Sequence, residues 1–190
     1  MILRLFRRTP RSDSIASLYG TIVAQARAPA FYQTYGVPDT ANGRLEMIVL
    51  HAVLVLRRLG GERRPGATAG PAFGQAIFDL FCRDMDANLR EMGVGDLAVP
   101  RAMRQIGEAF YGRQAAYAGA LAADDAPALV EALARNVFGP ERALGAARLA
   151  VYVREAVRHL ASQDGAAIGR GELAFPDPAA VEAAVSGAGT

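Results

Sequence analysis

The stretch Tyr35-Gly-Val-Pro-Asp-Thr-Ala-Asn-Gly-Arg-Leu-Glu-Met-Ile-Val-Leu-His-Ala-Val-Leu-Val-Leu-Arg-Arg-Leu59 decides the fold, because it joins a Tyr/Gly/Pro turn to the most apolar segment of the chain. Pro38 has the φ that a helix start needs, and Asp39 or Thr40 can cap the first free N–H groups. A helix that is apolar on nearly every side is typical of a protein core or a membrane span. The apolar run here is well short of the ~18 residues that a span needs. We therefore predict that residues 39–59 form the central helix of a soluble bundle.

Further helices are indicated before and after this segment, and no run of residues has a convincing strand pattern. Ser12 or Ser14 can cap the first helix, which ends before Pro29. A short aromatic connector at 30–36 leads to the central helix. The later helices are expected at about 72–92, 100–121, 125–138 and 141–163. We predict an all-α fold, a single-domain bundle of about six or seven helices around the central helix.

The domain organisation follows from these boundaries and from composition. We expect a basic N-terminal segment at 1–12, a helical domain at 13–165, and a C-terminal tail with a short helix at 166–190. Gly112 and Gln114 interrupt the apolar stripe of the helix that begins near Pro100, and a mid-helix glycine costs about 1 kcal/mol relative to alanine. The pair suggests either a close crossing by another backbone or a surface kept for a partner.

Composition limits the function classes. The 190 residues are 52% hydrophobic and 21% charged, so the chain can bury a substantial core and is not disordered. The net charge is +2 and every basic side chain is Arg, which is too mild a balance to argue for a specific nucleic-acid partner. Cys82 is the only cysteine, so no intrachain disulfide can form and a cytoplasmic location is expected. We interpret Cys82 as inert packing.

Basic residues near the N-terminus suggest a membrane-surface role. A secretory signal would need a longer apolar stretch after the charges. A short basic, apolar segment can lie on an anionic membrane surface, where each Arg contributes about 1 kcal/mol; the alternative is a frayed terminus. Under this hypothesis the protein is peripheral on the inner face of the plasma membrane. The candidate membrane-surface residues are Arg4, Arg7, Arg8 and Arg11, with a second basic cluster at Arg57, Arg58, Arg63 and Arg64.

No set of residues in the sequence specifies catalysis, a metal or a cofactor. His51 and His159 have no ligand partners at metal-site spacing, and a lone His in an apolar run is usually a core residue. Asp84 and Asp86 point about 200° apart on a helix, so they cannot share one ion. We expect no enzyme activity. The alternative is a small helical enzyme using His51, Arg113 or Asp84 in a pocket between helices.

Three separated motifs carry a resemblance to a known family. The first runs from LYGTIV at 18–23 through FY at 31–32 and YGVPDT at 35–40 to GRLEM at 43–47. The second is FCRDMDANLREMGVGD at 81–96, and the third is FYGRQAAY at 110–117. Over about residues 15–160 the chain resembles the ubiquinol–cytochrome c chaperone family.

The resemblance implies a chaperone that helps to assemble respiratory complex III. Eukaryotic members of the family bind newly made cytochrome b and, with a second small protein, the ribosome near its exit tunnel. We expect a bacterial-type member of the family, because the long targeting extension of the mitochondrial members is not seen in this sequence. We therefore expect cytochrome b or another complex III subunit as the partner, and not the ribosome.

A binding module needs a rigid scaffold and a surface rich in aromatic residues and Arg. The motifs supply a candidate partner-binding set, namely Phe31, Tyr32, Tyr35, Arg44, Asp84, Asp86, Arg90, Tyr111, Arg113 and Tyr117. In the alternative interpretation Phe31, Tyr35 and Tyr117 belong to the core and the charged residues pair with one another.

Overall fold

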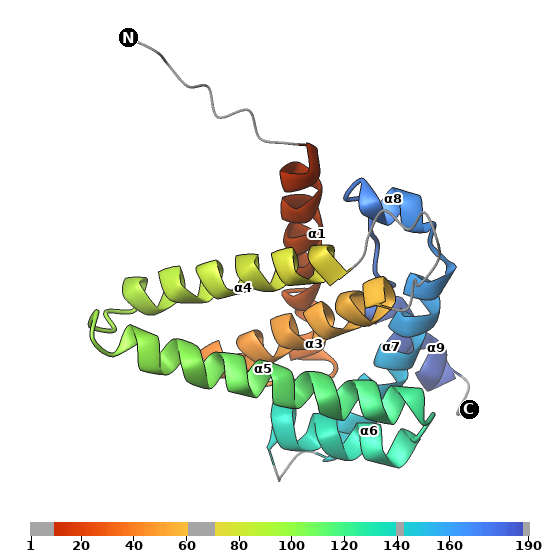
Figure 1. Ribbon diagram of the computed structural model, residues 1–190. Helices are drawn as coiled ribbons and strands as arrows, with labels where there is room; N and C mark the ends of the chain where they lie inside the picture. The colour runs from red at the N-terminus through yellow and green to blue at the C-terminus, as the bar shows by residue number, and fades with distance from the viewer. Residues whose placement is uncertain (1–9, 61–70, 140–142, 188–190) are drawn as a thin grey trace.

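The computed structural model describes residues 10–60, 71–139 and 143–187, and every regular element within these ranges is helical (Figure 1). This confirms the predicted all-α class. In chain order the elements are α1 (Pro10–Ala26), α2 (Pro29–Gln33), α3 (Ala41–Gly60), α4 (Pro71–Glu91), α5 (Val99–Ala122), α6 (Ala126–Leu133), the π-helical turn η1 (Ala134–Phe138), α7 (Ala143–Ser162), α8 (Gly165–Gly169) and α9 (Pro178–Gly187).

The predicted central helix is α3, which contacts α1, α4, α5 and α7 (Figure 1). Its residues are buried in an unbroken run from Glu46 to Val55, as an all-round apolar helix requires. Of the two predicted caps, Thr40 is the one used: its Oγ1 accepts a hydrogen bond from the Gly43 N–H at 3.1 Å. A side chain at Gly43 would lie 2.0 Å from the Pro38 carbonyl oxygen, so the turn before α3 requires glycine there.

Two local predictions from the sequence need correction. The connector predicted at 30–36 contains the helix α2, because Pro29 occupies its first turn, where a missing N–H costs nothing. The close backbone crossing suggested for Gly112 is absent: Gly112 is exposed, and no atom lies within 4 Å of a side-chain carbon built there. The other interpretation, a surface kept for a partner, stays a prediction.

The chain after α7 folds back onto the rest of the bundle. The Ser17 hydroxyl donates to the Gly171 carbonyl at 2.9 Å, and the Tyr35 hydroxyl donates to the Pro178 carbonyl at 2.8 Å. The last helix, α9, contacts α2 and α7. The segment predicted as a tail is thus bonded to α1 and to the chain that follows α2, while the boundary near residue 165 stays a prediction.

None of the helices within the described ranges combines the length and the apolar character that crossing a membrane requires. This agrees with the interpretation of the central segment as a core helix.

Candidate partner-binding site

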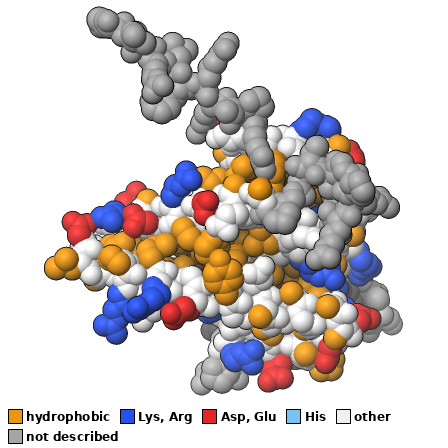
Figure 2. Space-filling model, in the orientation of Figure 1, with side chains coloured by type: hydrophobic (Ala, Val, Ile, Leu, Met, Phe, Trp, Pro, Cys, Tyr) orange, Lys and Arg blue, Asp and Glu red, His pale blue; other side chains and the backbone are white. Residues whose placement is uncertain are grey.

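The helices α3, α4 and α5 lie side by side (Figure 1). Two adjoining hollows on the surface are lined by residues of these helices and of the segments next to them. Their volumes are about 490 Å³ and about 320 Å³. The two share four lining residues, so we treat them as one feature, the α3–α5 groove. Those shared residues are Asn42, Leu45, Leu89 and Ile106. Figure 2 shows hydrophobic side chains gathered between α4 and α5, with charged side chains along both edges.

The groove follows from helical spacing in three segments. Met85 and Leu89 on α4, and Met92 in the turn directly after it, recur at intervals of three and four residues and line the same hollow. Leu45 and Ile106 face them from α3 and α5. Leu89 is only half-buried and Met92 is 63% exposed, so this end of the apolar row is open to solvent. Methionine side chains are flexible and adapt to differently shaped apolar partners.

Exposed polar groups form one edge of the groove where α1 ends and α3 begins. The Arg44 guanidinium pairs with the Asp39 carboxylate at 2.7 Å, and both side chains are more than half exposed. Tyr32 is half-buried, and its hydroxyl donates to the Ala26 carbonyl at 2.7 Å. Burial raises the pKa of Tyr32. Arg27 completes this edge.

A buried ion pair joins α3 to α5 beneath the groove. The Arg113 guanidinium donates two hydrogen bonds to the Glu46 carboxylate and one to the Ala109 carbonyl, the last at 3.1 Å. The Glu46 side chain is 3% exposed and the Arg113 side chain 22%. Burial raises the pKa of the Glu46 carboxyl more than the hydrogen bonds from Arg113 lower it. The pair therefore fixes the position of α5 against α3.

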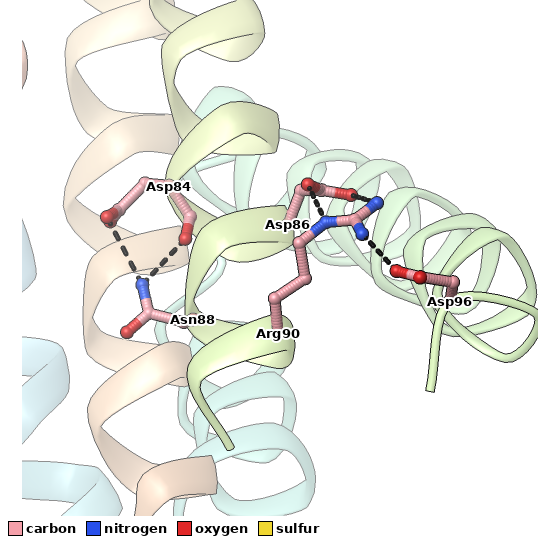
Figure 3. Close-up of polar contacts among 5 residues, drawn as sticks. All are labelled: Asp84, Asp86, Asn88, Arg90 and Asp96. Carbon is pink, nitrogen blue, oxygen red and sulfur yellow. Dashed lines mark hydrogen bonds and ion pairs between the residues drawn. The ribbon is translucent and has the colours of Figure 1, made fainter. Parts of the chain in front are cut away.

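The two aspartates of α4 have different surroundings, as their helical spacing predicts (Figure 3). Asp84 lines the groove and accepts hydrogen bonds from the Tyr19 hydroxyl at 2.8 Å and the Asn88 side-chain amide at 3.2 Å. Burial and the hydrogen bond to Asp84 raise the pKa of Tyr19. Asp86 instead pairs with Arg90 at 2.8 Å, and Arg90 also bonds Asp96 in the turn before α5. Among the described residues, no group of three acidic, His or Cys side chains has an arrangement that could hold a metal.

Tyr111 lies in a separate hollow of about 240 Å³ between the end of α3, the start of α4 and the middle of α5. Its ring is 56% exposed and packs against Phe78 with ring centroids 5.2 Å apart. Gln114, which interrupts the apolar stripe of α5, lines the same hollow. Both residues are thus available at the surface.

Three aromatic residues of the predicted set are in the core. Phe31, Tyr35 and Tyr117 are each at most 1% exposed, as the alternative interpretation expects. A side chain without exposed surface cannot contact a partner in this conformation. These three residues therefore belong to the core and are not proposed as contact residues. Arg44, Asp84 and Arg113 line the groove, and Tyr32 lies near Arg44 and Asp39 without lining it. Asp86 and Arg90 stabilise the α4–α5 turn, and Tyr111 lies in the separate hollow.

His51 belongs to a buried polar network. Its Nδ1–H donates to the Met47 carbonyl at 2.8 Å, which leaves Nε2 to accept from the Tyr152 hydroxyl at 3.0 Å. The Gln25 amide donates both to the Tyr152 oxygen and to the Pro176 carbonyl, each at 3.0 Å. Burial lowers the pKa of His51 to about 4. The enzyme alternative therefore loses His51 as an accessible acid or base.

The basic clusters are only partly described. Arg4, Arg7, Arg8, Arg63 and Arg64, and the side chain of Arg11, lie outside the described residues. Arg57 is exposed. Arg58 donates to the carbonyls of Leu160 and Gln163, both at 2.8 Å, and so stabilises the C-terminal end of α7.

The candidate set drawn from the motifs does not include the apolar lining of the groove. Met85, Leu89 and Met92 lie inside the second motif, but an apolar row at helical spacing is typical of a buried helix face. Their spacing gives the face on which they lie, but it does not tell which end of that face is covered by another helix. Leu45 and Ile106 were missed for the same reason.

Comparisons with known proteins agree with the resemblance. The family model described as ubiquinol-cytochrome C chaperone matches residues 33–175. The crystal structure of the Cbp3 homolog from Brucella abortus is similar over 94% of this chain and 98% of that one, with 38% sequence identity and a TM-score of 0.80. No curated protein sequence matches the chain.

Proposed function

We propose that this chain, which belongs to the ubiquinol-cytochrome C chaperone family, binds newly made cytochrome b through the α3–α5 groove during assembly of ubiquinol–cytochrome c reductase. The observation that carries the proposal is the groove itself. An open apolar trough between packed helices, with charged edges, is the kind of surface that accepts an amphipathic helix of another protein.

The lining of the groove suits a client that is not yet folded. Its apolar residues, among them Leu45, Leu89 and Met92, can cover apolar surface that would otherwise aggregate. The charged edges of the groove keep the free chaperone soluble. Because no residue of the groove needs to react, the proposal requires neither a cofactor nor catalysis.

The encounter takes place at the membrane, on the inner face of which the protein is peripheral. A membrane-protein client is made there, and the Arg residues at positions 4, 7, 8 and 11 would attract the chain to anionic lipid. Deleting residues 1–11 should then weaken binding to anionic vesicles and leave the groove unchanged.

The test is site-specific photo-crosslinking in the native cell. A photoreactive residue replaces Met92, which lines the groove and is 63% exposed. The matched control replaces Leu144 on α7, which is 84% exposed and lies outside the groove. We expect cytochrome b to be crosslinked from position 92 and not from position 144.

Two results would contradict the proposal. One is equal crosslinking from the two positions, and the other is recovery of no complex III subunit from position 92. Charge reversal at Arg113 does not test client binding cleanly, because it leaves Glu46 buried without a partner and destabilises the fold. Charge reversal at Asp86 lies outside the groove, so complex III levels should stay normal in that variant, which serves as a control.

A further inference from the structure

We infer, resting on the proposed function, that the α3–α5 groove selects an amphipathic helix with a basic side chain inside its apolar face, and that Asp84 is the residue that recognises it. The carboxylate lies among the apolar residues that line the larger hollow. A client helix with only apolar residues there would leave this charge in the contact without a partner.

The bonding of Asp84 keeps its charge available. Among the described residues its partners are the Tyr19 hydroxyl and the Asn88 amide, and both are neutral donors. These bonds fix the orientation of the carboxylate without neutralising it. A half-buried carboxylate beside apolar surface attracts a cation more strongly than a fully solvated one.

The other acidic groups of the groove already have basic partners. Asp39 pairs with Arg44 at the edge, and Glu46 pairs with Arg113 beneath the groove. Neither is free to discriminate between client side chains. Asp84 is therefore the acidic group of the groove that can pair with a basic side chain of the client.

Arg27 is the competing group, because it lines the same hollow and would favour an acidic client residue. Arg27 is exposed at the end of α1, where solvent and salt screen its charge. Asp84 is half-buried and lines the same hollow as Met85 and Leu89, where a bound helix would exclude water. We therefore expect the preference for a basic side chain to dominate.

The test uses the full chain and three synthetic amphipathic peptides of about 18 residues, which is five turns of helix. The peptides have the same Leu/Met face and differ only at its central position, which is Lys, Gln or Glu. Binding is measured by fluorescence anisotropy. We expect the Lys peptide to bind about fivefold more tightly than the Gln peptide, with the Glu peptide weakest.

The variant Asp84→Asn keeps a side-chain oxygen for Tyr19 and removes the charge. It should bind the Lys and Gln peptides equally, and unchanged affinity for the Gln peptide shows that its groove is intact. The matched control Asp86→Asn makes the same change two residues along α4, at a side chain that points away from Asp84 (Figure 3) and lines neither hollow. It should keep the preference of the natural chain.

The inference is overturned if the natural chain binds the Lys and Gln peptides equally, prefers the Glu peptide, or binds none of the three. Loss of the preference in Asp86→Asn as well as in Asp84→Asn would also overturn it. The peptides contain no cytochrome b sequence, so this outcome is separate from the crosslinking result that tests the proposed function.

Discussion

The two sides of α3 have different surroundings, a buried aromatic cluster on one side and an open groove on the other. On one side His51 lies among the rings of Phe31, Tyr152 and Phe175, and hydrogen bonds close the polar groups of this cluster. On the other side Leu45 faces the open α3–α5 groove. One helix thus supplies both a sealed core and the floor of a binding surface. The difference teaches that rigidity on one side lets the other side remain open without losing the fold.

The largest expected contrast between the two sides concerns truncation of apolar residues. Phe31→Ala removes a fully buried ring whose centroid lies 4.8 Å from that of Tyr152. We expect it to lower the free energy of unfolding by about 4 kcal/mol. The control Leu89→Ala, in the half-buried wall of the groove, should cost about 1 kcal/mol and chiefly weaken client binding. Urea unfolding followed by circular dichroism measures both, and similar costs would mean that the groove is closed in solution.

The next effect concerns the ion pair beneath the groove. Arg113→Ala leaves the Glu46 carboxylate buried without its partner, which should cost about 3 kcal/mol of unfolding free energy. Replacing both residues by Leu removes the buried charge as well and should recover most of that loss. If the single variant is as stable as the natural chain, Glu46 is solvated and the Glu46–Arg113 pair does not hold α3 and α5 together.

The smallest expected effect is the pH dependence of the unfolding free energy that comes from His51 in the buried cluster. The pKa of His51 is about 4 in the folded chain against 6.5 when unfolded, so acid protonates the unfolded state first. The stability that depends on neutral His51 is present above pH 6.5 and is lost as the pH falls toward 4. Between pH 8 and pH 5 this amounts to about 2 kcal/mol.

The measurement compares unfolding free energies of the natural chain and of His51→Gln across that pH range. The natural chain should lose about 2 kcal/mol more than the variant. Parallel curves would show that His51 is not held neutral by burial, and the sealed cluster would then be open to water.

Local patterns made much of the fold predictable from the sequence. Pro38 and Thr40 mark the start of α3, and Gly43 fits where a side chain would meet the Pro38 carbonyl. The opposite directions of Asp84 and Asp86 follow from 100° per residue and hold in the structure. The π-helical turn η1 and the helix α2 were missed, because five-residue elements produce no readable periodicity.

The candidate site was less predictable. The sequence motifs contained Arg44, Asp84 and Arg113, which the structure brings to one groove, but also Phe31, Tyr35 and Tyr117, which it buries. Aromatic residues suit an interface and a core equally well, so residue type alone could not separate them.

By itself the sequence determined that this chain is helical, where most of its helices begin and end, and which family it resembles. The helical class and the helix boundaries depend on neighbours within a few residues, through caps, prolines and the 3.6-residue period, whereas the resemblance depends on three separated motifs. Only the tertiary structure decided that Glu46 meets Arg113, that His51 is buried, and that Leu89 is half-buried while Met92 faces solvent. Those outcomes depend on which helix covers which face, and that is set by packing between segments far apart in the chain.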